Sequence, residues 1–175
     1  MQIVEAKDKQ RHLAEGLATS LAPYTTGSKA VLLMKLAEVL PCAQALVAEF
    51  SEEQLSGRED SYSRELLYTH PEGLFSVMLL SWRKGQHSPV HGHWTWCGYV
   101  VLKGELSEQI YRWENGAPQY ELERLRGVGD VVASDAGHGD IHRLGNNADE
   151  TAISLHVYGV DREHITTHIN RVFKD

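Results

Sequence analysis

The sequence predicts a mainly β domain of the α+β class, with helices at the N-terminal end followed by a double-sheet barrel of short strands. Helical periodicity is confined to about the first 50 residues, and beyond about residue 73 the pattern changes to short runs rich in Val, Ile, Leu, Tyr and Trp. Gly, Asn and Asp separate these runs at fairly even spacing, which is typical of a sandwich or barrel. A chain of 175 residues can bury one sizeable core, so we expect a single domain over residues 1–175.

Two amphipathic helices are expected in the N-terminal segment, residues 1–55, which would pack on the barrel. In residues 5–21 and 29–50, Leu, Ala, Val and Met recur at three- and four-residue spacing. Ser28 is a candidate N-cap for the second helix, and Pro41 is expected to kink or divide it, because proline lacks the backbone N–H that a helix interior needs.

The barrel core is expected over residues 62–160, where short strands follow one another. Asn115-Gly116 between two of them is typical of a β-hairpin, since both residues tolerate a positive φ. The expected strands are residues 74–82, 97–102, 105–113, 119–125, 130–134, 142–144 and 151–158.

Composition excludes several classes of partner. The formal net charge of −7 argues against nucleic acid and against anionic membrane surfaces, because both require a basic patch. No run approaches the ~18 consecutive apolar residues of a membrane-spanning helix. Two cysteines are too few for a disulfide scaffold, and the first ten residues lack the apolar core of a signal peptide, so a reducing cytoplasm is the expected location. Oligomeric state is left open.

The pair His91-Gly92-His93 is the first indication of a metal site. In a strand, residues i and i+2 point to the same face, so both imidazoles can reach one ion. In a chain with ten histidines, however, such a pair also arises by chance, and solvated or packed histidines explain it equally well.

The surrounding spacing resembles the two motifs of the cupin superfamily, whose fold is a double-stranded β-helix or jelly-roll barrel. The first motif is matched by Gly85, His91, His93, Cys97 and Gly104, with Cys97 at the position where most cupins carry glutamate. The second motif is matched by Gly129, Asp130, Gly139, His142 and Asn146. It departs from the pattern in having Asp135 in place of proline and a slightly longer turn before Gly139. His142 would therefore supply the third imidazole.

Three neutral imidazoles leave a divalent ion its full charge, which favours an anionic ligand such as a thiolate. Three-histidine sites also hold zinc, so the ligand set alone does not name the metal.

From residue 62 to residue 158 the chain resembles the cysteine dioxygenase family, the thiol dioxygenases of the cupin superfamily. The matching parts are Tyr62-Ser63-Arg64, residues 75–82, residues 87–93, residues 102–106, residues 140–146 and the strand Ser154-Leu155-His156-Val157-Tyr158.

This resemblance implies a role for each site residue. His91, His93 and His142 would bind Fe(II), Arg64 with Tyr62 beside it would bind the substrate carboxylate, and Ser154, His156 and Tyr158 would form a hydrogen-bonded triad. Arginine suits a carboxylate because its planar fork keeps its charge. The alternatives are a structural Arg64, a packing role for Tyr62, and ordinary core packing of His156 and Tyr158.

The implied function is an Fe(II)- and O2-dependent thiol dioxygenase that converts a small thiol carboxylate, L-cysteine, to its sulfinic acid. Relatives that act on 3-mercaptopropionate share a tryptophan at the position of Trp96 but usually carry glutamine at that of Arg64, so 3-mercaptopropionate stays an alternative substrate. Two alternatives come from other classes. One is a cupin isomerase or hydrolase that uses Zn or Mn as a Lewis acid, and the other is a non-catalytic ligand-binding cupin.

Cys97 and Tyr158 form a possible crosslink. Mammalian members of the family join a cysteine near this point to the tyrosine of the Ser-x-His-x-Tyr strand through a thioether. Counting back from Gly104 places Cys97 at the matching position, which implies a shorter loop after His93 and an unshifted strand. The alternative is a buried, unreactive thiol.

Overall fold

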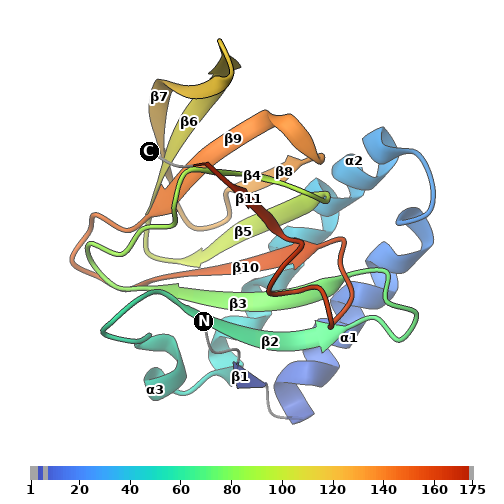
Figure 1. Ribbon diagram of the computed structural model, residues 1–175. Helices are drawn as coiled ribbons and strands as arrows, with labels where there is room; N and C mark the ends of the chain where they lie inside the picture. Colours follow the sequence, from blue (N-terminus) through green and yellow to red (C-terminus); the bar gives the residue numbers. More distant parts are fainter. Residues whose placement is uncertain (1–3, 6–7, 174–175) are drawn as a thin grey trace.

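The computed structural model describes residues 4–5 and 8–173, which form two facing β-sheets with helices on one side (Figure 1). The six-stranded sheet has the order β1 (Val4–Glu5), β2 (Ser63–Thr69), β3 (Ser76–Trp82), β10 (Ala152–Tyr158), β5 (Cys97–Lys103) and β8 (Val131–Ser134). The five-stranded sheet has the order β11 (Asn170–Val172), β4 (His91–His93), β9 (Gly137–Gly145), β6 (Leu106–Glu114) and β7 (Ala117–Arg126). Apart from the parallel pair β1–β2, the paired strands are antiparallel. The predicted mainly β cupin barrel is confirmed.

The helices precede the barrel in the chain and cover the outer face of the six-stranded sheet (Figure 1). They are α1 (Asp8–Leu21), η1 (Ala22–Tyr24), α2 (Lys29–Val39), η2 (Leu40–Glu49) and α3 (Glu52–Leu55). The α-helix that begins at Lys29 ends at Val39, and the chain continues as a 3-10 helix with Pro41 in its first turn, so the predicted division is confirmed. Ser28 does occupy the N-cap position, but its side chain makes no capping hydrogen bond.

Four strands fall outside the expected set: β1, β2, β4 and β11. Strand β2 was missed because Arg64 and Glu65, both buried, interrupt its apolar pattern. Strands β1 and β11 are only 2 and 3 residues long, which is too short for a recognisable period. The expected strand at 142–144 is longer in the structure and begins at Gly137.

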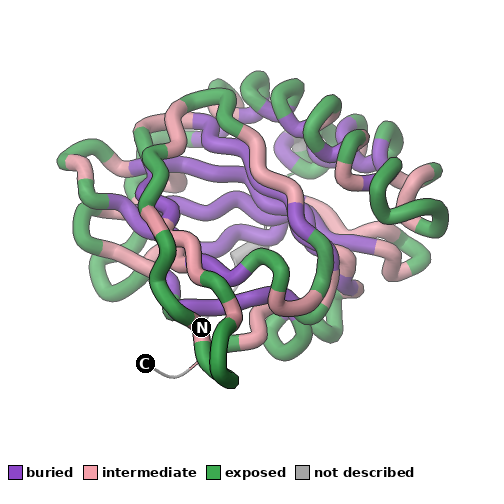
Figure 2. The backbone as a smooth tube through the Cα atoms, turned by 90° about the horizontal axis from the view of Figure 1, so that it is seen from above, coloured by how far each residue is buried: buried purple, intermediate pink, exposed green. Residues whose placement is uncertain are grey.

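The six-stranded sheet is buried on both faces, so its side chains divide between two cores. In β3, Val77 and Leu79 pack with the helices, whereas Met78, Leu80 and Trp82 point into the barrel. Figure 2 shows the buried strands enclosed by exposed loops, with the helices along one side and buried only where they face the sheet. The outer core, between the six-stranded sheet and the helices, therefore stabilises the fold, while the barrel interior also holds polar groups.

The hairpin between β6 and β7 has the predicted turn. Glu114 pairs with Ala117, which leaves Asn115 and Gly116 as a two-residue loop with φ values of 51° and 82°. Both values lie in the left-handed region that Asn and Gly tolerate best, which explains the signal in the sequence.

The helical segment Lys29–Glu49 is long and apolar enough, by length and composition alone, to cross a membrane. In the structure its apolar side chains pack on β5 and β8, and Leu32, Leu36, Leu40 and Leu46 are buried there. A helix that covers a sheet passes the same test, so this segment is a helix of the outer core.

We expect Leu36→Ala to lower the free energy of unfolding by about 2–5 kcal/mol, because Leu36 is fully buried and packs against Gly98 of β5. Chemical denaturation monitored by circular dichroism measures this loss. Met34 lies on the same helix but is 71% exposed, so Met34→Ala is the matched control and should change stability by less than about 0.5 kcal/mol. Equal stabilities for the two variants would contradict this packing.

Candidate metal centre

Strands β4 and β9 bring three histidines to one point inside the barrel. His91 and His93 lie two residues apart on β4 and therefore share a face, and His91 pairs directly with His142 of β9. One ligand atom from each of the three lies within 4.8 Å of the others, and all three residues are buried. Within the described part of the chain, this is the one group of three or more His, Cys, Asp or Glu residues with such geometry.

The nitrogen atoms of this group fit a metal ion. His91 Nδ1 lies 2.9 Å from the Pro89 carbonyl oxygen, and His142 Nδ1 lies 2.9 Å from Glu108 Oε1, so in each ring Nε2 is left for another partner. His142 Nε2 and His93 Nδ1 are buried without a hydrogen-bond partner, which is costly unless a ligand or an ion satisfies them. Burial lowers the pKa of His91 and of His93 well below the usual 6.5, so both rings are neutral and carry the lone pairs that coordinate a metal.

The histidines line a small cavity with a free volume of about 10 Å³. It is also lined by Tyr62, Arg64, Leu80, Trp82, Ser88, Cys97, Leu144, His156, Tyr158 and Asn170. This volume holds about one water molecule and lies far below the 300–1,000 Å³ range of pockets for drug-sized ligands, so the cavity suits only a small ligand.

Arg64 supplies a buried positive charge to the cavity. It is 6% exposed on β2, and the pairing of β2 with β3 places it opposite Leu80. Its Nη2 atom donates a long hydrogen bond of 3.4 Å to the Tyr62 hydroxyl, and Tyr62 itself stacks on Trp82 with ring centroids 4.3 Å apart. Among the described residues no carboxylate pairs with the Arg64 guanidinium, and its Nε is buried without a partner. A buried cation without a counter-charge is unfavourable, so the cavity is suited to an anion.

Ser154, His156 and Tyr158 form the hydrogen-bonded chain that the sequence predicts, and Trp82 extends it. The Trp82 indole N–H donates to Ser154 Oγ at 2.9 Å, Ser154 Oγ lies 2.9 Å from His156 Nε2, and His156 Nδ1 lies 3.0 Å from the Tyr158 hydroxyl. Because the indole is only a donor, the Ser154 hydroxyl accepts from it and gives its own hydrogen to His156 Nε2. A neutral His156 then carries its hydrogen on Nδ1 and donates it to Tyr158, which leaves the phenol hydrogen free for the cavity.

Burial keeps the two titratable members of this chain, His156 and Tyr158, uncharged. It raises the pKa of Tyr158 well above 10.0 and, together with the nearby Arg64 charge, lowers the pKa of His156 well below 6.5. Tyr158 is therefore a protonated phenol at neutral pH, and His156 is a neutral imidazole that fixes its orientation.

Cys97 lies directly opposite Tyr158 in the β5–β10 register, and both residues line the cavity. This is the register expected from counting back from Gly104. Cys97 is 2% exposed, and burial raises the pKa of its thiol, so the sulfur is protonated when nothing else acts on it.

Sequence reasoning missed Glu108 and Arg126. Glu108 is 3% exposed and bridges His142 to Arg126, whose Nη2 lies 2.6 Å from Glu108 Oε2. Burial alone would raise the pKa of Glu108, but the contacts with His142 and Arg126 outweigh it and lower this pKa to about 2. Apart from Ser107, the other polar side chains of these two strands are half-buried or exposed, so the sequence pattern does not distinguish Glu108 and Arg126.

Asn170 was also missed, because a three-residue strand far along the chain gives no signal. It pairs with His93 in the β11–β4 register and lines the cavity, where its Oδ1 atom is buried without a partner.

Trp96 lies outside the cavity. It is 5% exposed and packs with Phe75 in the core between the sheet and the helices, with ring centroids 6.2 Å apart. Trp94 is 54% exposed and lies under the Arg171 guanidinium.

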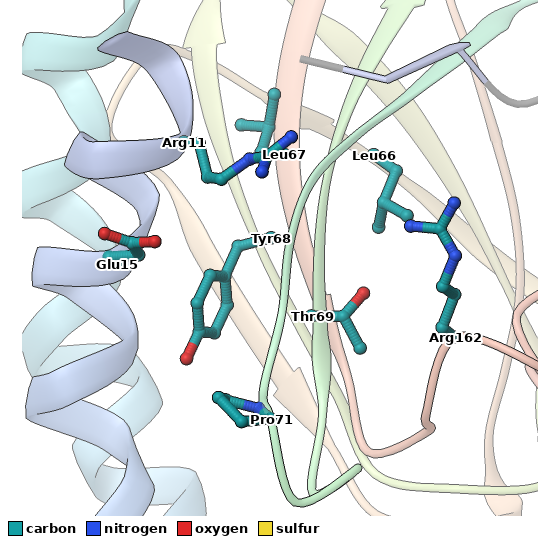
Figure 3. Close-up of a pocket in the computed structure, with 8 residues that line it drawn as sticks. All are labelled: Arg11, Glu15, Leu66, Leu67, Tyr68, Thr69, Pro71 and Arg162. Atoms are coloured by element: carbon teal, nitrogen blue, oxygen red, sulfur yellow. The ribbon is translucent and has the colours of Figure 1, made fainter. Parts of the chain in front are cut away.

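A larger and more open hollow, of about 300 Å³, lies between α1 and β2 (Figure 3). Arg11 and Glu15 project into it from α1, and Tyr68 faces them from β2. Its lining contains no histidine or cysteine, so the small cavity is the candidate site for chemistry despite its lesser volume.

Two solved structures that are similar to this chain have TM-scores just below 0.5. A protein from Thermus thermophilus has a TM-score of 0.49 and 19% identity, covering 63% of this chain and 95% of that chain. A cupin superfamily protein from Desulfitobacterium hafniense has a TM-score of 0.47 and 16% identity, covering 60% of this chain and 83% of that chain. Structural similarity at this level gives no information about the function of this chain.

The sequence comparisons are more specific. Cysteine dioxygenase type 1 of Danio rerio is 29% identical over 103 residues, which cover 55% of this chain and 50% of the relative. The Bos taurus protein of the same name is 28% identical over 131 residues, covering 72% of this chain and 61% of the relative. The matches thus span between 50% and 61% of the length of these relatives. Residues 34–169 match the family model for cysteine dioxygenase type I. Because this match covers most of the chain, the protein belongs to the cysteine dioxygenase type I family.

Proposed function

We propose that this protein is an Fe(II)-dependent thiol dioxygenase that oxidises L-cysteine to cysteine sulfinate with O2. The observation that carries the proposal is the buried Arg64, which has no carboxylate partner among the described residues, beside three buried histidines that can hold a metal. A thiol carboxylate supplies what each group lacks, namely a carboxylate for the guanidinium and a thiolate for the metal.

Fe(II), when bound by His91, His93 and His142, supplies the redox chemistry that adds O2 to sulfur and the charge that favours thiolate over thiol. The overall reaction is balanced, because a thiol and O2 give a sulfinate and one proton. Both oxygen atoms end on sulfur, so no external reductant is required. The cavity leaves little room for water, which limits side reactions of the oxidised sulfur.

The protein's own groups hold the substrate and direct one hydrogen bond. Arg64 binds the carboxylate through its fork of N–H donors and so fixes one end of the molecule. Tyr158 donates its free phenol hydrogen into the cavity, since His156 occupies the other side of its oxygen as a donor. This donor is positioned before the substrate arrives, so little reorganisation accompanies the reaction.

L-cysteine is favoured over 3-mercaptopropionate by the position of the two residues that distinguish the relatives. Arg64 lines the cavity, whereas Trp96 is packed in the outer core and does not touch the substrate space. Both thiols carry a carboxylate, so the comparison of the two as substrates is part of the test. The proposed partners are the thiol and O2, and the proposed location is the cytoplasm.

Two other classes of function fit the site less well. A Zn or Mn isomerase or hydrolase would use the three histidines but has no evident need for a phenol donor positioned by Trp82, Ser154 and His156. A non-catalytic cupin that only binds a ligand would not require that donor either. Anaerobic loading with Fe(II), followed by O2 uptake with L-cysteine, 3-mercaptopropionate and cysteamine in parallel, tests the proposal. Absence of O2 uptake with every thiol would refute it.

We expect His91→Ala, His93→Ala and His142→Ala each to remove bound iron and thiol oxidation while the fold is retained. The barrel has two apolar cores of its own, so its folding does not depend on the metal. Iron content by elemental analysis and circular dichroism measure the two effects. An iron-replete, active His142→Ala protein would exclude this ligand set.

We expect Arg64→Ala to lower kcat/KM for L-cysteine by about 30-fold or more, since loss of a desolvated charge pair costs about 2 kcal/mol or more. Cysteamine lacks the carboxylate, so its kcat/KM should be nearly unchanged and serves as the matched control. Steady-state O2 uptake measures both substrates. An equal loss for both would show that Arg64 acts structurally and does not read the carboxylate.

Cys97 and Tyr158 lie in the correct register for a thioether, which would form with loss of two hydrogen atoms to the oxidant O2 during turnover. We therefore expect a decrease of about 2 Da in intact mass after turnover and protection of Cys97 from alkylation in denatured protein. A Cys97→Ala variant is the control and should show no mass change. If Cys97 alkylates fully after turnover, it is a buried thiol and Tyr158 acts as an unmodified phenol.

A further inference from the structure

The three candidate ligands differ in the hydrogen bonds that their rings make. His91 Nδ1 lies 2.9 Å from the carbonyl oxygen of Pro89, which is a neutral acceptor. His93 Nδ1 is buried and has no partner among the described residues. His142 Nδ1 lies 2.9 Å from Glu108 Oε1, and Glu108 is an anion. The three histidines therefore have different partners, and one of them, His142, contacts a carboxylate.

Strand register explains why Glu108 reaches both of its partners. Strand β6 lies between β9 and β7 in the five-stranded sheet. His142 is opposite Ile110 on one side, and Arg126 is opposite Leu106 on the other, so each partner is two residues away from Glu108 on a neighbouring strand. Diagonal neighbours at this spacing lie within reach of long side chains on the same face. Glu108 thus joins a ligand strand to a strand without ligands.

The contact is tightly held. The Glu108 and His142 side chains are 3% and 10% exposed, and the Arg126 side chain is 18% exposed. Both Arg126 Nε and Nη2 bond Glu108 Oε2, at 2.8 and 2.6 Å, which leaves Oε1 for His142. Because Arg126 holds one oxygen of the Glu108 carboxylate, the other oxygen has a fixed position from which it accepts a hydrogen bond. Such an acceptor fixes the Nδ1–H tautomer of His142 and makes its Nε2 a stronger donor to a metal.

We propose that Glu108, anchored by Arg126, is a positioning residue that makes His142 the strongest electron donor of the three histidines. The negative charge of Glu108 thereby acts on the metal site through His142, although the direct ligands of that site are all imidazoles. Two consequences follow: tighter retention of the metal, and stabilisation of its higher oxidation state. This inference rests on the metal site of the proposed function, but it concerns binding and redox potential rather than the substrate.

The competing explanation is that Glu108 and Arg126 form only a structural ion pair across β6 and β7. A structural pair would affect the stability of the fold but not the properties of a metal held by folded protein. Glu108→Gln separates the two explanations, because glutamine keeps the shape and a neutral acceptor for His142 while it removes the charge. Glu108→Ala removes the acceptor as well.

The experiment measures two quantities on folded protein: Zn(II) and Fe(II) affinity by chelator competition under anaerobic conditions, and the midpoint potential of the Fe(III)/Fe(II) couple. We expect Glu108→Gln and Glu108→Ala to weaken metal binding by about 10- to 100-fold, with the larger loss in the alanine variant. Both should shift the midpoint potential to more positive values. Glu123→Gln is the matched control, because Glu123 bonds Ser107 on the same pair of strands but does not contact a ligand histidine. The control should change neither quantity.

Unchanged affinity and potential in folded Glu108→Gln protein would overturn the inference, even if its melting temperature falls. Should the alanine variant fail to fold, the glutamine variant alone decides, since it preserves side-chain volume. The proposed function is tested separately by O2 uptake of the unaltered protein. Suppose that the unaltered protein oxidises no thiol, while Glu108→Gln weakens metal binding and shifts the midpoint potential to a more positive value. This result would refute the proposed function and support the inference.

Discussion

Removal of water from the space between the two sheets is the constraint on which the rest of this structure depends. In that space each polar group must find a partner within the protein or point into the cavity, because an unpaired buried group is costly. Trp82, Ser154, His156 and Tyr158 satisfy one another in a chain, and Glu108 is satisfied by Arg126 and His142. Atoms of Arg64, His93, His142, Tyr99 and Asn170 are left without a partner, and those of Arg64 and of the histidines are atoms that an anionic substrate and a metal would satisfy. The same exclusion of water keeps His91 and His93 neutral and Tyr158 protonated.

A polar barrel interior is possible because the helices provide a second core. Since they cover the outer face of the six-stranded sheet, strands β3, β10 and β5 are buried on both sides, and their apolar side chains alternate with those that face the cavity. On β10, Ile153, Leu155 and Val157 pack on the helix side, while the side chains between them carry the hydrogen-bonded chain. A shift of one residue would exchange the two sets completely. The side chains that stabilise the fold and those that belong to the candidate site therefore lie on the same strand at different positions.

Two fixed charges lie beside the three histidines. Arg64 is a cation that lines the cavity, and Glu108 is an anion that contacts His142. The thiol carboxylate that we propose as substrate would bring two negative charges, one for the metal and one for Arg64. Arg126 lies outside the cavity and offsets the negative charge of Glu108, so this carboxylate contacts His142 without occupying the cavity. The site thus separates the charge that tunes the metal from the charge that selects the substrate.

By itself the sequence determined the class of fold, from the chain's periodicity, and the His91-His93 pair, from spacing within one strand. The resemblance to the cupin motifs and to the cysteine dioxygenase family added His142 and the alternating Ser154-His156-Tyr158 strand. The division at Pro41 and the turn at Asn115-Gly116 were also predictable, since local backbone chemistry decides them. Contacts between strands are decided by register and by the twist of the sheets, which no local pattern encodes. Only the tertiary structure therefore brought Glu108 to His142, set Trp82 at the head of the hydrogen-bonded chain, carried Asn170 to the cavity and placed Trp96 outside it.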